Sequence, residues 1–147
     1  MKITIVAAAL LGFASQTTAV GNCFADWQQF DVSGHSVNIL SPYSLYDQIN
    51  DFCITINLQQ QARYTRRLAF TRSNDGVPVD VDIELLHADR KNPEVVFANG
   101  CIELFKGLTD LCVYDTGRFA GGYWASDNQR WAVLIVPLPD SMPPLLP

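Results

Sequence analysis

Histidine is the first residue type to examine for acid–base chemistry, and this chain has only two. A secreted hydrolase or ribonuclease would need a histidine close to a carboxylate. His87, between Glu84 and Asp89, is the best local candidate. No HExxH, GxSxG or glycine-rich phosphate loop accompanies it. We therefore interpret His87 as a solvated strand end and predict no catalytic residue.

A row of carboxylates, Asp80, Asp82 and Glu84, alternates with apolar residues along one segment. In a strand, neighbours in such a row lie about 7 Å apart, close to the carboxylate separation of inverting glycosidases. Every alternating acidic strand has this spacing, so it is weak evidence for catalysis. Calcium would need a loop with converging oxygens, which the row lacks. We predict a solvated face paired with Arg67, and neither a metal nor a cofactor.

Arginines with aromatic residues between them form the only basic cluster of the chain. A phosphate- or nucleic-acid-binding surface would use such a pattern. Cross-strand pairing with the acidic row explains Arg67 more simply. The cluster consists of Arg63, Arg66, Arg67 and Arg72, with Tyr64 and Phe70 between them.

An aromatic group close to two glycines could stack on a sugar or fill a partner's pocket. The group comprises Tyr123, Trp124 and Trp131. Core packing and hairpin pairing also explain it. From the two clusters we take Tyr123, Trp124, Arg63 and Arg66 as the candidate binding surface.

The N-terminus has the composition of a secretory leader over residues 1–19. Lys2 supplies the positive charge, residues 3–13 the apolar run and residues 17–19 a small-residue cleavage site. Cleavage there would leave 128 residues (147 minus 19) with a formal charge of −6 (9 basic minus 15 acidic residues). We therefore expect a secreted, extracellular protein with no membrane span after cleavage.

Length and charge limit the organisation and the partners. We predict a single compact domain over 20–136 and a disordered proline-rich tail over 137–147. The acidic balance argues against nucleic acid and anionic membranes as partners. We expect a monomer that meets a host or competitor protein or glycan.

The elements that must position these residues follow the order strand, helix, strand, strand, helix, strand. We expect helices over 44–59 and 92–112 and strands over 35–40, 64–72 and 77–86, and a final hairpin of 119–124 and 130–136 takes the last strand position of this order. This order predicts an α+β fold, a ferredoxin-like split βαβ sandwich with an antiparallel sheet and two helices on one face.

Capping signals support both helices. Ser44 and Asp47 form a capping pair for the first, although apolar alternation over 52–58 would also suit a strand. Asn92 is the expected N-cap of the second. Its interior glycines each cost about 1 kcal/mol relative to alanine, and a turn at 99–100 could open a shorter helix instead.

In the hairpin between residues 64 and 86, one register pairs apolar residues on one face and oppositely charged residues on the other. A four-residue loop over 73–76 pairs Arg72 with Val77. It follows that Phe70 faces Val79, Leu68 faces Val81, and Arg67 faces Asp82.

Four cysteines in a secreted chain predict two disulfides. Cys101 and Cys112 lie about 16 Å apart on a continuous helix, too far for a bridge. Antiparallel helices bring Cys53, late in the first, close to Cys101, early in the second. We therefore predict Cys53–Cys101 and Cys23–Cys112, the latter holding the N-terminal arm.

The leader, the acidic body, the cysteines on facing helices and the element order together resemble small cysteine-stapled secreted proteins of plant-associated fungi. Some of those share the α/β sandwich of virally encoded smut-fungus killer toxins. The resemblance implies a host-interacting or antagonistic effector or toxin-like factor without catalysis.

A secreted, non-enzymatic interaction protein is therefore the leading hypothesis. The alternative is a small secreted hydrolase of glycan or RNA, whose site is assembled from distant residues. A concave pocket holding His87 or the acidic row would favour the enzyme, and a flat surface with exposed Trp124 or Tyr123 would favour the binding protein.

Overall fold

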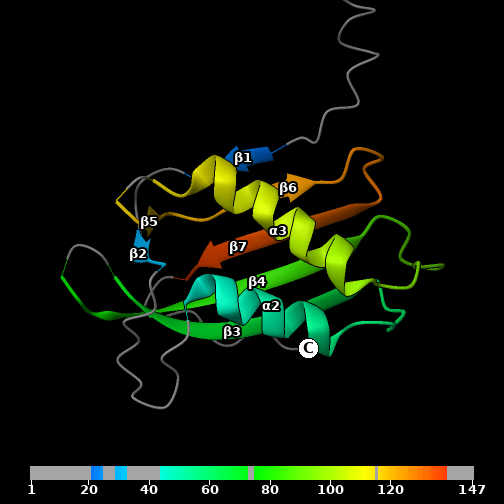
Figure 1. Cartoon of the computed structure of the whole chain (residues 1–147), viewed down its shortest axis with the longest axis horizontal. Helices are drawn as coiled ribbons and strands as arrows, with labels where there is room; N and C mark the ends of the chain where they lie inside the picture. Colours follow the sequence, from blue (N-terminus) through cyan, green and yellow to red (C-terminus); the bar gives the residue numbers. More distant parts are fainter. Residues whose placement is uncertain (1–20, 25–28, 33–43, 73–74, 115, 139–147) are drawn as a thin grey trace, which may run out of the picture.

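A five-stranded antiparallel sheet with strand order β1-β6-β7-β4-β3 is the largest element of the computed structural model (Figure 1). The structure describes residues 21–24, 29–32, 44–72, 75–114 and 116–138. The strands of this sheet are β1 Gly21–Cys23, β3 Arg63–Thr71, β4 Pro78–His87, β6 Gly122–Ala125 and β7 Trp131–Pro137. A separate two-stranded sheet pairs β2 Phe30–Asp31 with β5 Arg118–Phe119.

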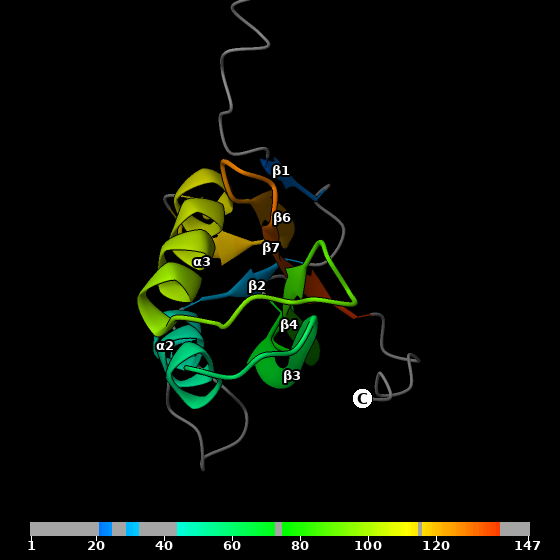
Figure 2. The same ribbon diagram turned by 90° about the vertical axis from the view of Figure 1, so that its right-hand side faces the viewer.

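Both helices, α2 Leu45–Thr55 and α3 Ala98–Cys112, cover the same face of the large sheet (Figure 2). Because apolar and polar side chains alternate along the strands, one face of the sheet is apolar and packs against the helices. The predicted α+β class, antiparallel sheet and two helices are confirmed. Side chains that fill the core with less than 2% exposure include Phe105, Ile83, Leu85, Leu108, Val133 and Ile135.

The ferredoxin-like split βαβ arrangement is not confirmed. β4 lies between β3 and β7, and β6 and β1 follow β7 towards the other edge. The predicted strand over 35–40, the leader over 1–19 and the end of the tail over 139–147 all lie outside the described residues. No helix in the described ranges is long and apolar enough to cross a membrane.

The β3–β4 hairpin has the predicted register. Arg72 donates its backbone N–H to the carbonyl of Val77 over 2.8 Å. The structure pairs Phe70 with Val79, Leu68 with Val81, and Arg67 with Asp82. The apolar pairs face the helices and the charged pair faces away from them, so the hydrophobic pattern fixed the register.

Helix α2 begins at the predicted capping box, because the Ser44 hydroxyl accepts from the Asp47 N–H and the Asp47 carboxylate accepts from the Ser44 N–H. The competing strand assignment is wrong. The helix ends at Thr55, earlier than the predicted 59, and Leu58 adopts a left-handed φ of 63°. Leu58 donates to the carbonyl of Val96, so tertiary bonds replace the last expected turn.

Helix α3 begins at Ala98, and the predicted start at Asn92 is wrong. Val96 donates its N–H to the Gln59 carbonyl over 2.9 Å, which holds the preceding segment extended. The Asn57 side chain accepts from the Ala98 N–H over 2.9 Å and replaces the expected Asn92 cap. Residues 99–100 lie inside the helix, so the alternative turn there is wrong as well.

The two predicted disulfides are confirmed. Cys53, in the last turn of α2, joins Cys101, in the first turn of α3, with Cα atoms 5.7 Å apart. Cys23 in β1 joins Cys112 at the end of α3, with Cα atoms 5.4 Å apart. The bridges therefore fix both ends of α3, one to the other helix and one to an edge of the sheet.

Candidate functional site

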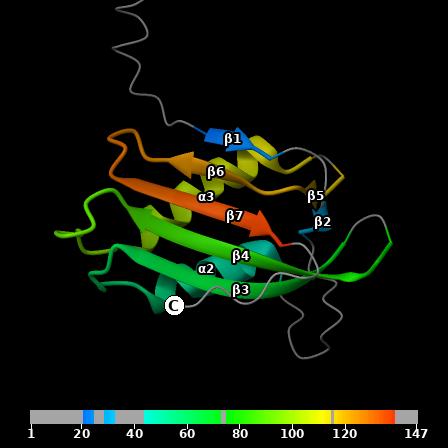
Figure 3. The same ribbon diagram turned by 180° about the vertical axis from the view of Figure 1, so that it is seen from behind.

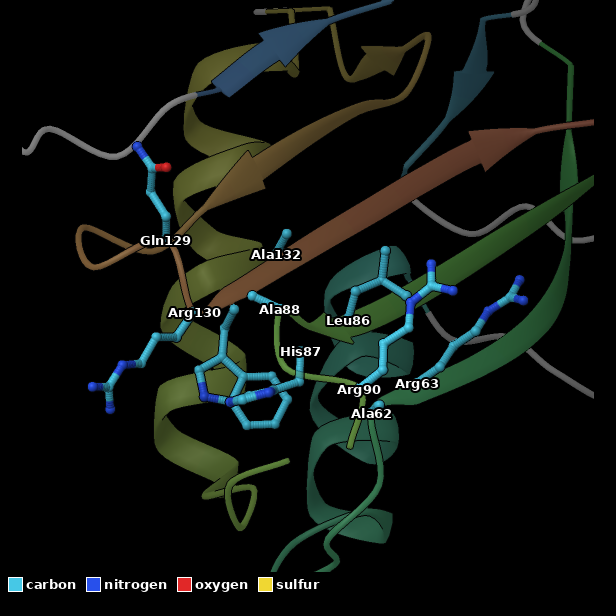
Figure 4. A pocket seen from close by; sticks show the side chains of 10 residues that line it. Ala62, Arg63, Leu86, His87, Ala88, Arg90, Gln129, Arg130 and Ala132 are labelled. Carbon is cyan, nitrogen blue, oxygen red and sulfur yellow. The ribbon is translucent and has the colours of Figure 1, made fainter. Parts of the chain in front are cut away.

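A pocket of about 430 Å³ lies at the end of the sheet where β4 stops and β3 and β7 begin. Figure 4 shows Arg63 and Arg90 on one side of it and Arg130 on the other. The strand pair His87 and Trp131 supplies an imidazole and an indole to the lining. Three arginines thus line one pocket of a chain whose net charge is −5.

The loop that carries Arg90 is shaped by its neighbour Asp89. One Asp89 carboxylate oxygen accepts from the backbone N–H groups of Lys91 and Asn92, both over 3.0 Å. These bonds lower the pKa of Asp89, and the bond from Asn92 has the larger effect. Ala88 donates to the Arg130 carbonyl over 2.8 Å, which ties the loop to the start of β7. Hydrogen bonds therefore hold the backbone at Arg90 and Arg130 in place.

His87 is buried, with 6% exposure, and the predicted solvated strand end is wrong. Its Nδ1 lies 3.1 Å from the Asp89 backbone nitrogen, and its Nε2 lies 3.2 Å from a Glu94 carboxylate oxygen. Trp131 packs edge-on at 4.4 Å between ring centroids. The predicted carboxylate neighbour Glu84 bonds Arg63 instead. Burial follows because β4 extends to His87 and the loop folds back over its side chain.

Glu94 connects the histidine to an arginine. Its carboxylate lies 2.6 Å from an Arg130 guanidinium nitrogen on one side and 3.2 Å from His87 on the other. The hydrogen bond to His87, followed by the charge of Arg130, lowers the pKa of Glu94. Glu94 is therefore ionised at neutral pH and holds Arg130 at the pocket.

The remaining arginines differ in their partners. Arg63 lies 2.9 Å from Glu84, and the carboxylate is buried while half of the Arg63 side chain is exposed. Arg90 is exposed and makes no ion pair within the part of the chain that the structure describes. A guanidinium carries five N–H donors, so the pocket keeps donors for an anion from outside.

The acidic row is not the solvated face that its pattern indicated. Asp82 is 2% exposed and Glu84 is 7% exposed. Arg67 bonds both carboxylate oxygens of Asp82, over 2.7 and 2.9 Å, as the register predicts. Only Asp80 is exposed. β4 lies between β3 and β7, and Arg67 and Arg63 of β3 pair with Asp82 and Glu84. Two of the three carboxylates are thus committed to arginines.

The four residues of the predicted binding surface do not come together. Tyr123 and Trp124 are consecutive in β6 and point to opposite faces. Trp124 lies against Gly107 of α3. Arg66 faces the helices, 2.6 Å from the Asp51 carboxylate and over the Phe52 ring. Only Arg63 of the four lines the pocket.

Sequence reasoning missed Arg90, Glu94 and Arg130 as site residues. The signal that could have found them is the pairing of His87 with Trp131 across β4 and β7. That pairing brings the loop after β4 beside the residue that precedes β7. The strand pattern alone does not show that the final strand lies next to β4, so these residues could not be grouped.

A scan of protein-family models, a search of curated proteins and a search of solved structures found no match to this chain. Within the described ranges, no group of three His, Cys, Asp or Glu side chains could hold a metal ion. The arrangement at the pocket is one that can bind an anion.

Proposed function

We propose that this chain is a secreted, non-enzymatic binding protein that takes an acidic sugar of an extracellular glycan into the basic pocket. The observation that carries the proposal is that Arg63, Arg90 and Arg130 all line one cavity in an acidic chain. Arg90 has no acidic partner in the described part of the chain. The ligand supplies that partner.

The chemistry of the pocket favours a carboxylated sugar. A guanidinium presents paired donors that match a carboxylate in a bidentate arrangement. Trp131 lines the same cavity and offers an apolar face against which a sugar ring can pack. A volume of about 430 Å³ is within the range of small-ligand sites and admits one or two sugar rings.

Acid–base catalysis is less well supported. The pocket does hold His87, which is the observation that favours the alternative of a secreted hydrolase. Both ring nitrogens of His87, however, lie within hydrogen-bond distance of Asp89 and Glu94. The lowered pKa of Glu94 suits a fixed counter-ion better than a general acid. Turnover of a glycan or RNA that disappears in a folded His87→Ala variant would establish the hydrolase instead.

The setting of the proposal is extracellular. The predicted leader, the two disulfides and the resemblance to small secreted proteins of plant-associated fungi support an effector or toxin-like factor acting on a host or competitor. Disulfides persist in oxidising compartments. A host or competitor glycan is the proposed partner, and the protein acts as a monomer without nucleic acid.

Calorimetric titration with a uronic-acid trisaccharide tests the proposal, with the matching neutral trisaccharide as the ligand control. We expect binding of the acidic sugar only, and a loss of about tenfold or more in affinity in Arg90→Gln, because a charge-assisted hydrogen bond is removed. Lys106→Gln removes the same charge from α3, away from the pocket, and should leave the affinity unchanged. Equal affinities for both sugars would refute the proposal.

A further inference from the structure

The outer edge of β3 has backbone groups that the sheet does not use. β3 is the last strand of the sheet, beside β4 only (Figure 3). In an antiparallel pair, alternate residues direct both N–H and C=O groups towards the partner strand, and the residues between them direct both groups away. Ala62 and Arg72 bond residues on the β4 side. Counting from them, Arg63, Thr65 and Arg67 point outwards.

No described residue bonds the backbone groups of Arg63, Thr65 or Arg67 on this outer side. Further along, Phe30 of β2 forms an antiparallel bridge with Arg72, the residue directly after β3. The unpaired edge therefore covers the first half of the strand, where a short extended segment of another chain could bond it.

A groove of about 410 Å³ runs between this half of β3 and α2. Its apolar lining includes Phe52 of α2, Ile56 directly after α2, and Tyr64 of β3. A strand added to the edge would direct every second side chain into the groove and the others to the opposite face. The groove selects apolar side chains for the first set.

The opposite face of the edge presents arginine donors. The carboxylates of Asp82 and Glu84 are buried there, with side-chain exposures of 3% and 9%. Arg63, which bonds Glu84, is 51% exposed. The exposed members of these pairs are therefore the guanidinium groups, and acidic side chains complement them.

We infer that the β3 edge is a docking site for an extended protein segment in which apolar and acidic residues alternate. The segment adds a sixth strand to the sheet, bonds the outward backbone groups of Arg63, Thr65 and Arg67, and places its acidic side chains beside the arginines. Strand addition is an established mode of peptide recognition. The site is separate in composition from the glycan pocket, although Arg63 lies where the two meet.

A second copy of this chain is a poorer occupant. Antiparallel pairing of two β3 edges centred on Thr65 would set arginines of one copy directly opposite arginines of the other. Like charges directly opposite in a sheet are destabilising. Basic residues on an edge strand thus oppose self-pairing while leaving an acidic strand acceptable.

The test uses a nine-residue peptide of alternating valine and glutamate with blocked termini. We expect it to bind the full chain, to shift the amide resonances of Thr65 and Arg67, and to slow exchange of those amide protons. N-methylation of the peptide nitrogens that face β3 should weaken binding more than about tenfold, because several hydrogen bonds are lost. A peptide with lysine in place of glutamate should not bind.

Thr65→Pro is the matched variant of the protein. Proline removes only an outward N–H here and is tolerated at such positions of edge strands, so the β3–β4 ladder should stay intact. We expect about fivefold weaker peptide binding or more, with unchanged binding of the uronic-acid trisaccharide. Equal binding of the N-methylated peptide, shifts confined to the basic pocket, or self-association of the chain through β3 would each overturn the inference.

Discussion

Arg67 and Asp82 form a bidentate ion pair in which the Asp82 side chain is only 3% exposed. The hydrogen bonds to Asp82 raise the pKa of Arg67, so the guanidinium is charged at neutral pH. Removing one partner of such a pair leaves a buried charge without compensation. Breaking this pair should therefore lower the free energy of unfolding more than breaking an exposed ion pair of the protein.

We expect Arg67→Met to lower the free energy of unfolding by about 2–3 kcal/mol, because it leaves the Asp82 carboxylate buried and unpaired. Urea denaturation measures the change. The control is Asp51→Asn, which breaks the pair with Arg66 where the carboxylate is 70% exposed and should cost less than about 1 kcal/mol. Equal losses of unfolding free energy in the two variants would contradict this account, because the buried pair would then contribute no more to stability than the exposed pair.

Glu94 makes the stability of the fold depend on pH in the acid range. Its pKa lies below the ordinary value of 4.5, chiefly because of the hydrogen bond with His87. A carboxyl group with a lowered folded pKa stabilises the fold above its unfolded pKa, and this contribution is lost as the pH falls through the folded value. Glu94→Gln should therefore be less stable than the parent at neutral pH, with a difference that shrinks below about pH 4.5.

Urea midpoints of the parent and Glu94→Gln, measured across the acid range, check this expectation. Glu103→Gln changes an exposed carboxylate of α3 and should show no comparable convergence with pH. A difference between Glu94→Gln and the parent that persists unchanged at the lowest pH would mean that the carboxylate charge does not stabilise the fold.

At the scale of elements, two glycines of α3 have the same effect on helix propensity but differ in what packs against them. A Cβ at Gly107 would lie 2.6 Å from Trp124 ring atoms, whereas a Cβ at Gly100 would meet nothing within 4 Å. Gly107 is therefore the residue that allows β6 to place an indole against the helix. The sequence pattern alone registers both glycines only as weak points of the helix.

Alanine substitutions should separate these roles. Gly100→Ala should raise the free energy of unfolding by about 0.5–1 kcal/mol, because helix propensity improves without a clash. Gly107→Ala should lower it by about 1–3 kcal/mol, because the overpacking against Trp124 outweighs the same gain in propensity. Thermal and urea unfolding of both variants measure the difference, and stabilisation by both would contradict the packing seen here.

The elements show which features of this fold can be predicted from sequence. The capping box of Ser44 and the β3–β4 register are local or depend on alternation, and both were predicted. The start of α3 depends on the hydrogen bond between Val96 and Gln59, which are far apart in sequence. Likewise, the basic pocket depends on β7 lying beside β4. Local patterns do not contain these long-range pairings, so the pocket could not be predicted.

At the scale of the whole molecule, the disulfides connect the helices to each other and to the sheet. They span 48 and 89 residues of sequence. A crosslink over such distances restricts the unfolded chain, with a typical effect of about 2–4 kcal/mol. The double variant Cys53→Ala with Cys101→Ala should lose stability in this range in urea denaturation.

The parent protein under reducing conditions supplies the control for that variant. Complete reduction should lower the unfolding temperature further than loss of Cys53–Cys101 alone, because Cys23–Cys112 also opens and frees β1 from α3. An unfolding temperature that is unaffected by reduction, with four thiols titrated, would show that packing alone holds the helices on the sheet.

The most direct test of the central claim is to map where an acidic sugar binds. Amide resonances of the full chain would be followed by NMR during titration with the uronic-acid trisaccharide. We expect saturable shifts confined to the pocket, at Ala88, Arg90, Arg130 and the indole N–H of Trp131, and their loss in Arg90→Gln. Saturable shifts elsewhere on the molecule, with the pocket resonances unchanged, would contradict the claim that this pocket is the functional site.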